Sequence, residues 1–189
     1  MRLFVAANLP ETVRNQLYAD TATLRAAADR VKWVAAASLH LTLKFLGHQD
    51  EGRVGDFERA LATVAARHSP IDVQTRDVGA FPNFRRPRVV WVGMTGVDAL
   101  SALALDVDRT FGGLGIPIES RPFRAHLTLG RVKDEMRPAD ARALEDRSRS
   151  GVPSRAFSIE TIDLMQSELG PGGSRYSVLA AVPLHARGT

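Results

Sequence analysis

One four-residue sequence occurs twice in this chain, and it limits the fold and the chemistry more than any other feature. The tetrad His-Leu-Thr-Leu at residues 40–43 recurs 86 residues later, at residues 126–129. Because nearly half of average composition is apolar, a histidine precedes an apolar-Thr-apolar run only about once in a hundred times. The chain has only five histidines, so the repeat indicates two equivalent structural settings.

Both tetrads have the alternating polar and apolar pattern of a half-buried β-strand. Side chains along a strand point alternately to its two faces, so His40 and Thr42 share one face while the two leucines share the other. The same holds for His126 and Thr128. We therefore expect the leucines to anchor each strand in the core, and the two His/Thr pairs to face one another across a cleft.

Two imidazoles at one cleft suit in-line displacement at phosphorus. A neutral histidine can take a proton from an attacking water, and a protonated one can deliver a proton to the departing ribose oxygen. An ordinary histidine pKa of about 6.5 allows both tasks near neutral pH, and each positioned proton transfer is worth about 10²–10⁴-fold in rate. The threonine hydroxyls would donate to phosphate oxygens, and no metal is needed.

A metal site is the alternative for the same histidines. His40, His48 and His126 could converge on one ion. However, the nearest carboxylates, Asp50 and Glu51, belong to the start of the next expected helix. This ligand set is poor for a metal, so the sequence favours acid–base chemistry.

Composition sets further limits. The 189 residues are 44% hydrophobic and 24% charged, as in ordinary globular proteins. No apolar run approaches the roughly 20 residues that cross a bilayer, and no signal peptide begins the chain. The absence of cysteine excludes disulfides and thiolate metal sites and fits a cytoplasmic location. A net charge of +4 permits a polyanionic ligand but predicts no long electrostatic footprint.

The order of expected elements has the mixed pattern of an α+β protein with a hint of internal duplication. Strands are expected at 2–8, 39–45, 71–79, 88–94, 125–132, 155–166 and 176–184. Helices are expected at 10–30, 51–67, from an N-cap at Asp98 to the glycines at 112–115, and at 138–148, with a hairpin turn at 170–174. Nothing resembling a linker separates the halves, so residues 1–189 are expected to form a single domain.

A few other residues attract attention. The segment 81–88 interleaves aromatic and basic side chains, as RNA-contacting loops do, although a solvated hairpin tip gives the same pattern; its members are Phe81, Phe84, Arg85, Arg86 and Arg88. Arg124 alternates onto the face of His126, where it could meet a phosphate or form a surface salt bridge. His48, His68 and His185 are expected to be structural or solvated.

The residues around both tetrads resemble the two-histidine (2H) phosphoesterases, and in particular the RNA 2′,3′-cyclic phosphodiesterases of bacteria and archaea, also called 2′-5′ RNA ligases. The resemblance rests on residues 33–34 (WV), 39–47 (LHLTLKFLG) and 121–131 (RPFRAHLTLGR), and it extends to residues 2–6, 87–93, 164–169 and Tyr176. The chain departs from the family at Ala125, where proline often precedes the second histidine, but no catalytic group is lost.

The resemblance implies a bilobal fold, in which two pseudo-symmetric and interleaved antiparallel-sheet lobes carry helices on the outside and enclose a central cleft. It also implies hydrolysis of an RNA or nucleoside 2′,3′-cyclic phosphate to a 2′-phosphomonoester without metal, ATP or another cofactor. RNA termini or 2′,3′-cyclic nucleotides would be the substrates. A monomer with no protein partner and no membrane association is expected.

The resemblance also implies roles for individual residues. His40 would be the general acid on O3′ and His126 the general base for water, although pseudo-symmetry makes the exchange of these roles easy to imagine. Thr42 and Thr128 would hold phosphate oxygens.

Phe45 and Arg131, each five residues after its histidine, would sandwich the terminal base. In a flat strand this odd spacing puts both opposite the histidine face. They reach a ligand only if the strands bend near Lys44 and Gly130, which a glycine permits. A place in the core is the alternative for Phe45.

Other functions remain open at this point. The chain could be a 2′-5′ RNA ligase, a phosphodiesterase for another cyclic nucleotide, or a non-catalytic nucleotide- or RNA-binding module. The presence of both histidines argues against the last, because simple phosphate binding usually uses Arg, Lys and backbone N–H groups.

Overall fold

The computed structural model describes residues 1–170 and 173–185. Its strands are β1 (Arg2–Asn8), β2 (Val31–Trp33), β3 (His40–His48), β4 (Ile71–Phe81), β5 (Val89–Met94), β6 (His126–Val132), β7 (Ala156–Ile159), β8 (Thr161–Gly170) and β9 (Gly173–Pro183). Its helices are α1 (Glu11–Asp20), α2 (Ala22–Ala27), α3 (Val54–Ala65), α4 (Val97–Gly112) and α5 (Pro138–Arg149), with 3₁₀ turns at Ala36–Ser38 and Glu51–Arg53.

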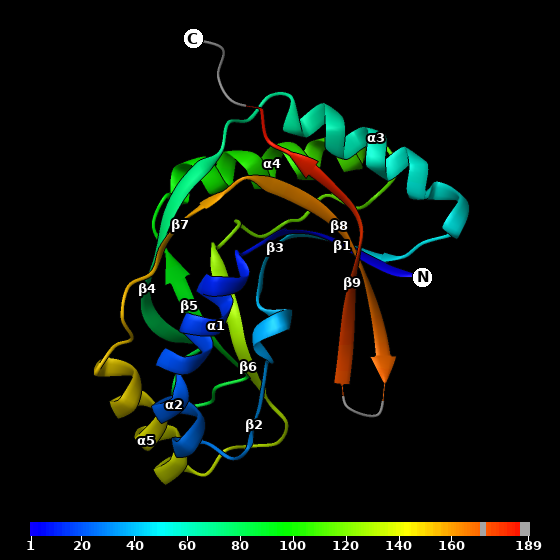
Figure 1. Cartoon of the computed structure of the whole chain (residues 1–189). Helices are drawn as coiled ribbons and strands as arrows, with labels where there is room; N and C mark the ends of the chain where they lie inside the picture. The colour runs from blue at the N-terminus through cyan, green and yellow to red at the C-terminus, as the bar shows by residue number, and fades with distance from the viewer. Residues whose placement is uncertain (171–172, 186–189) are drawn as a thin grey trace.

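The strands form one sheet in the order β7-β4-β5-β6-β3-β1-β8-β9, with β2 added to β6. Every pair is antiparallel. The two central strands, β3 and β6, share a single register pair, so the sheet is weakly joined at its middle. It therefore divides into one lobe of β1, β3, β8 and β9 and another of β2, β4, β5, β6 and β7 (Figure 1).

Helices cover each lobe separately. α3 and α4 pack together against β8, β9 and β3, whereas α5 packs against β4 and α2. Figure 1 shows α3 and α4 at one end of the molecule and α1, α2 and α5 at the other. The chain crosses between lobes, since β1 belongs to the first lobe and α1, which follows it, lies with the second. The predicted bilobal α+β fold is confirmed.

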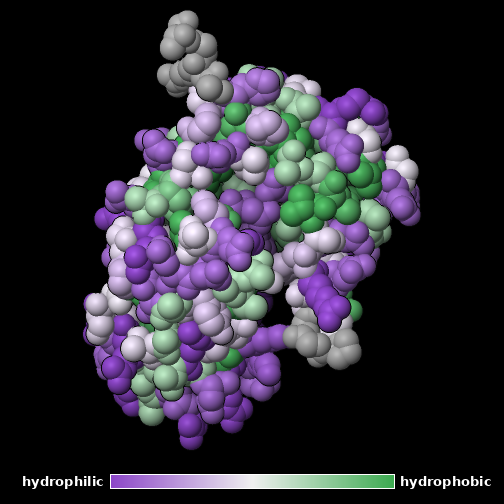
Figure 2. Space-filling view, in the orientation of Figure 1, coloured by the Kyte–Doolittle hydropathy of each residue, from purple (hydrophilic) through white to green (hydrophobic). Residues whose placement is uncertain are grey.

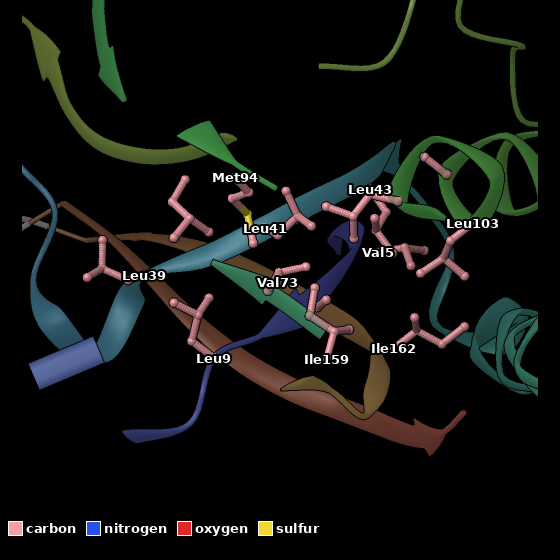
Figure 3. Packing of buried hydrophobic residues seen from close by; sticks show 14 of the residues in the cluster. Val5, Leu9, Leu39, Leu41, Leu43, Val73, Met94, Leu103, Ile159 and Ile162 are labelled. Carbon is pink, nitrogen blue, oxygen red and sulfur yellow. The ribbon is translucent and has the colours of Figure 1, made fainter. Parts of the chain in front are cut away.

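Apolar periodicity explains how these elements pack. The leucines of both tetrads point into one core shared with α4 and the neighbouring strands, as Figure 3 shows for Leu41, Leu43 and Leu103. The helical spacing predicted for α3 and α4 buries one stripe of each helix. Phe57 of α3 and Phe111 of α4 join the two stripes, with ring centroids 5.6 Å apart.

The long helix predicted at 10–30 is wrong. It is two helices, α1 and α2, interrupted at Thr21. The Thr21 hydroxyl donates to the carbonyl oxygens of Leu17 and Tyr18, each 3.0 Å away, and such bonds compete with regular helix. Val31, just beyond the predicted helix, begins β2, a strand of three residues that is too short for its pattern to be recognised.

Three smaller expectations also need correction. The strand predicted at 155–166 is two strands, β7 and β8, separated at Glu160. α4 is preceded by Gly96, whose φ of 71° puts it in the left-handed region, so Asp98 lies in the first turn instead of at the cap. In the predicted hairpin, Gly170 pairs with Gly173, and residues 171–172 lie outside the described residues.

Hydrophilic side chains cover most of the face in Figure 2, and apolar colour gathers in its upper part, below α3. In the part of the chain that the structure describes, every helix is too short or too polar to cross a bilayer.

Candidate active site

The two tetrads lie side by side at the junction of the lobes. Their first leucines form the register pair between β3 and β6, and both are fully buried. An antiparallel register continued from this pair places His40 opposite Thr128 and Thr42 opposite His126, all on one face. Diagonal neighbours across antiparallel strands lie about 7–8 Å apart, which is the relation of the two histidines. The predicted convergence of the tetrads is thus the arrangement that the sheet produces.

A β-bulge lies at the same position in each tetrad. The pairing of β3 with β1 skips Leu43, and the pairing of β6 with β5 skips Leu129. Each skipped leucine is the third residue after its histidine. One extra residue reverses the alternation of faces beyond the bulge, so Phe45 and Arg131 come onto the histidine face. The bend that these residues require therefore exists in both strands.

The bulge in β3 puts Phe45 on the histidine face and Lys44 behind the sheet, the reverse of what regular alternation along the strand predicts. Phe45 is 61% exposed, so the alternative that it belongs to the core is wrong. Lys44 points behind the sheet, where it is buried and forms an ion pair with Asp108 of α4. Its ammonium also donates to the carbonyl oxygen of Pro117, 2.8 Å away. Lys44 is therefore a structural residue.

Gly130 serves a different purpose from the one predicted. Its φ is not positive, and the skipped residue of the bulge is its neighbour. A Cβ atom at Gly130 would lie 2.4 Å from Cγ1 of Val31 and 3.0 Å from Cε3 of Trp33. The glycine is therefore needed because β2 packs closely against it.

Both imidazoles are held by the same kind of hydrogen bond. Nδ1 of His40 lies 2.9 Å from the carbonyl oxygen of Ser38, and Nδ1 of His126 lies 2.6 Å from that of Arg124. Each carbonyl belongs to the residue two positions before the histidine. Because a carbonyl oxygen only accepts, Nδ1 carries a proton and Nε2 is left for exchange with a ligand. In His40, Nε2 lies 3.1 Å from the Thr42 hydroxyl, which donates to it.

The pKa values of both histidines are lowered. Burial is the largest cause in each case, and the positive charge of Arg131 lowers both pKa values further. The carbonyl oxygens of Ser38 and Arg124 oppose this by accepting from Nδ1. Arg131 lies beyond the bulge of β6, on the face that carries both rings. An anion bound beside them would offset that charge and raise both pKa values.

The metal alternative fails on geometry. His48 ends β3, eight residues from His40, a separation of about 26 Å along a strand. It therefore cannot share an ion with His40 and His126. Asp50 and Glu51 lie beyond it in the chain. Within residues 1–170 and 173–185, no three His, Asp or Glu side chains are grouped as metal ligands would be.

The remaining candidates are the other two histidines and the segment 81–88. His68 is structural, since its Nε2 lies 2.9 Å from Oδ2 of Asp106. The backbone N–H of His185 donates to the carbonyl of Ala65, and its side chain is exposed. In the segment 81–88, Arg85, Arg86 and Arg88 are exposed, whereas Phe84 packs against the core.

Phe81 is not part of a solvated tip. It ends β4, and its ring contacts both Trp91 and His126, with centroid separations of 5.0 and 5.1 Å. The Arg124 guanidinium lies 5.8 Å from the centroid of the Phe81 ring, which is consistent with its expected place on the His126 side.

Three aromatic residues at the site were not assigned from the sequence. Phe4, Trp91 and Tyr176 each lie within 6.3 Å of a histidine ring, measured between centroids. They come from β1, β5 and β9, far from the tetrads in the chain. No local pattern marks them, because only the strand order brings them to the histidines.

Comparison with known proteins defines the class of this molecule. The family model described as LigT like Phosphoesterase matches two stretches of equal length, residues 8–91 and 93–176. Each stretch contains one tetrad, in agreement with the duplication expected from the repeat. The chain belongs to the LigT-like phosphoesterases, and the suspected 2H phosphoesterase family is confirmed.

Individual relatives agree over nearly the whole length. The chain is 35% identical to the RNA 2′,3′-cyclic phosphodiesterase of Archaeoglobus fulgidus, covering 95% of this chain and 98% of that protein. It is 33% identical to the protein of that name from Methanothermobacter thermautotrophicus, covering 94% and 95%. Among solved structures, TT0787 of Thermus thermophilus matches with a TM-score of 0.80 at 30% identity over all of both chains. The complex of E. coli LigT with 3′-AMP matches with a TM-score of 0.71 at 28% identity over 97% of each.

Proposed function

We propose that this protein hydrolyses RNA or nucleoside 2′,3′-cyclic phosphates to 2′-phosphomonoesters. The observation that carries the proposal is the matched pair of imidazoles on one sheet face, each with Nδ1 tied to a backbone carbonyl and Nε2 free of the backbone. Relatives named RNA 2′,3′-cyclic phosphodiesterase match over most of the chain and support the same substrate class.

In the proposed reaction His126 is the general base. Its neutral Nε2 accepts a proton from a water molecule whose oxygen attacks phosphorus. The hydrogen bond between its Nδ1 and Arg124 is exposed, whereas the corresponding bond of His40 is partly buried. Access of water to the second tetrad supports this assignment.

His40 is then the general acid. As the bond between phosphorus and O3′ breaks, protonated His40 delivers its Nε2 proton to O3′, and the phosphate stays on O2′. One P–O bond forms and one breaks, and the two histidines end with their protonation states exchanged. Thr42 and Thr128, which flank the histidines on the same face, donate to the non-bridging oxygens.

The bound substrate itself prepares the acid. Burial and Arg131 lower both histidine pKa values in the free protein, which favours the neutral base but not the protonated acid. A cyclic phosphate carries one negative charge, and a charge placed near both rings favours their protonated forms. We therefore infer that His40 gains its proton together with the substrate.

Phe45 and Arg131 complete the proposed site by holding the terminal base. Phe45 presents an exposed ring on the histidine face, and Arg131 lies at the equivalent position of the second tetrad. An aromatic ring and a guanidinium plane can both stack on any nucleobase, so little base preference is expected.

The test is hydrolysis of 2′,3′-cyclic AMP by the wild-type protein and by His40→Ala and His126→Ala, with and without EDTA. Each substitution removes one positioned proton transfer and should lower kcat by about 10²–10⁴-fold. His48→Ala is the matched control, since His48 is exposed at the other end of β3, and it should leave the rate unchanged.

EDTA should have no effect on the wild-type rate. Loss of activity with EDTA would contradict the metal-free mechanism, and full activity in both histidine variants would remove the histidines from the reaction. Binding of the cyclic nucleotide without any turnover would favour the non-catalytic module.

A further inference from the structure

Each active-site imidazole has an aromatic ring standing perpendicular to it at the same separation. The Tyr176 ring of β9 lies 5.1 Å from His40, between centroids, at an interplanar angle of 83°. The Phe81 ring of β4 lies 5.1 Å from His126 at 89°. These strands lie on opposite sides of the central β3–β6 pair, so the two contacts are built independently and arrive at the same geometry.

A second ring supports each contact. Phe4 lies 5.0 Å from His40 and 5.3 Å from Tyr176, and Trp91 lies 5.0 Å from Phe81 and 6.3 Å from His126. We call these sets the first triad (Phe4, His40 and Tyr176) and the second triad (Phe81, Trp91 and His126).

The supporting rings are themselves fixed. Phe4 is buried in a small cluster with Ala6 and Met165. The Trp91 ring lies over Gly79, where a Cβ atom would come within 2.2 Å of the indole. Both triads therefore rest on rigid parts of the sheet, one in each lobe.

The imidazoles need this support for a specific reason. The outer torsion of a histidine has broad, roughly two-fold minima, and a flip about it would replace Nε2 by carbon at the point of proton transfer. The hydrogen bond from Nδ1 to the carbonyl of Ser38 or Arg124 opposes the flip at one edge of the ring. A perpendicular aromatic ring limits the same rotation and excludes water from one side.

We propose that Tyr176 and Phe81 are positioning residues for His40 and His126, respectively, and that each fixes the plane of its imidazole so that Nε2 faces the substrate. This inference rests on the proposed function. The essential element is the ring in both cases, since one member of the pair is tyrosine and the other phenylalanine. The phenolic hydroxyl of Tyr176 is therefore dispensable.

Several charged residues lie near the two triads. Arg131 acts on both histidines. The Arg124 guanidinium lies 5.8 Å from the centroid of the Phe81 ring, and the buried Asp163 accepts from Asn8, the β1 residue opposite His40. Substitution of Tyr176 by an apolar residue removes none of these charges, so a change in the His40 titration reports the loss of the ring. Phe81→Leu also removes the ring beside which the Arg124 guanidinium lies, and Phe81→Tyr, which keeps a ring there, controls for that contact.

The test uses Tyr176→Leu and Phe81→Leu, with Tyr176→Phe and Phe81→Tyr as the conservative variants. Phe84→Leu is a matched control, because Phe84 packs against the core close to Phe81 in the chain. NMR titration of the imidazole Cε1–H resonances in the free protein measures each histidine separately. Tyr176→Leu should raise the pKa of His40 toward its ordinary value and leave His126 unchanged, and Phe81→Leu should do the reverse.

Turnover of 2′,3′-cyclic AMP provides the second measurement. Because small misplacement of a reacting group can cost about 10²-fold, each leucine variant should lose roughly 10- to 100-fold in kcat with little change in KM, while the conservative variants keep most of the activity. If Tyr176→Leu does not fold, as judged by circular dichroism, Tyr176→Met takes its place.

Several results would overturn the proposal. One is an unchanged histidine titration and kcat in both leucine variants. Another is a Tyr176→Phe variant as slow as Tyr176→Leu, because the hydroxyl would then act directly. The titration does not require turnover. A selective pKa change in a protein that hydrolyses nothing would support the ring contacts while contradicting the proposed reaction.

Discussion

The two tetrads agree on the face that carries the histidines and differ on the face behind it. In front, each has the same bulge, the same Nδ1 hydrogen bond and the same perpendicular ring. Behind β3, the buried pair of Lys44 and Asp108 ties the strand to α4. At β6, Gly130 leaves room for the side chains of Val31 and Trp33 in β2, which pairs beside the strand. The two strands therefore repeat the geometry that presents an imidazole, whereas different kinds of packing support them from behind.

The second residue after each skipped leucine also differs between the two strands. Phe45 and Arg131 occupy equivalent positions five residues after their histidines, and one is an uncharged ring while the other is a cation. Of these two residues, only Arg131 carries a charge that lowers the histidine pKa values. Phe45 and Arg131 thus hold equivalent positions in the two strands but differ in charge.

The largest effect is expected from removing both imidazoles. If His40 and His126 act in one concerted displacement, the double variant His40→Ala/His126→Ala should be about as slow as the slower single variant, since residues that act as a unit are non-additive. Each single loss should be about 10²–10⁴-fold. Rates of cyclic phosphate hydrolysis in all three variants measure this.

A double variant whose loss equals the product of the two single losses would contradict the concerted use of the pair. Such a result would mean that the two histidines contribute independently to the barrier, and the similarity of their settings would then have another cause.

The next effect concerns the support behind β3. Asp108→Ala leaves the Lys44 ammonium buried without its partner, and breaking a buried ion pair in this way costs about 3–5 kcal/mol in the free energy of unfolding. Replacement of both members, Lys44→Met with Asp108→Leu, removes the charge and should cost much less. Urea unfolding of the two variants measures the difference, and equal destabilisation would show that the charge is not what matters.

Sequence reasoning put both tetrads on half-buried strands, as the structure has them, because burial with period two is a local signal. It could not place Phe45 and Lys44. Continued alternation along β3 puts Lys44 beside His40 and Phe45 in the core, and the bulge at Leu43 reverses both. That bulge depends on pairing with β1, so no pattern within the strand reveals it.

The aromatic triads were missed for a related reason. Tyr176 lies 50 residues after His126 in the chain, and it meets His40 only because the order of strands puts β1 and β8 between β3 and β9. The prediction of one helix over residues 10–30 was wrong for a local reason. The Thr21 hydroxyl donates to two carbonyl oxygens of the preceding turn, where the helix is interrupted. The sequence thus predicted the strands that carry the histidines, whereas the aromatic surroundings of each histidine depend on the order of strands in the sheet.

The smallest effect concerns Phe45 and Arg131, which lie beyond the bulges of β3 and β6. Phe45→Ala and Arg131→Met each remove one proposed stacking partner of the terminal base, which costs about 1–3 kcal/mol, or roughly 5- to 150-fold in KM.

Only Arg131→Met also removes a positive charge that lowers both histidine pKa values. Without it both pKa values rise, so the base is neutral only at higher pH and the acid stays protonated to higher pH. Both limbs of the kcat/KM profile should therefore move to higher pH in Arg131→Met and stay in place in Phe45→Ala. If the two variants shift the pH profile equally, the charge of Arg131 does not set the histidine pKa values, and the proposed difference between Phe45 and Arg131 is wrong.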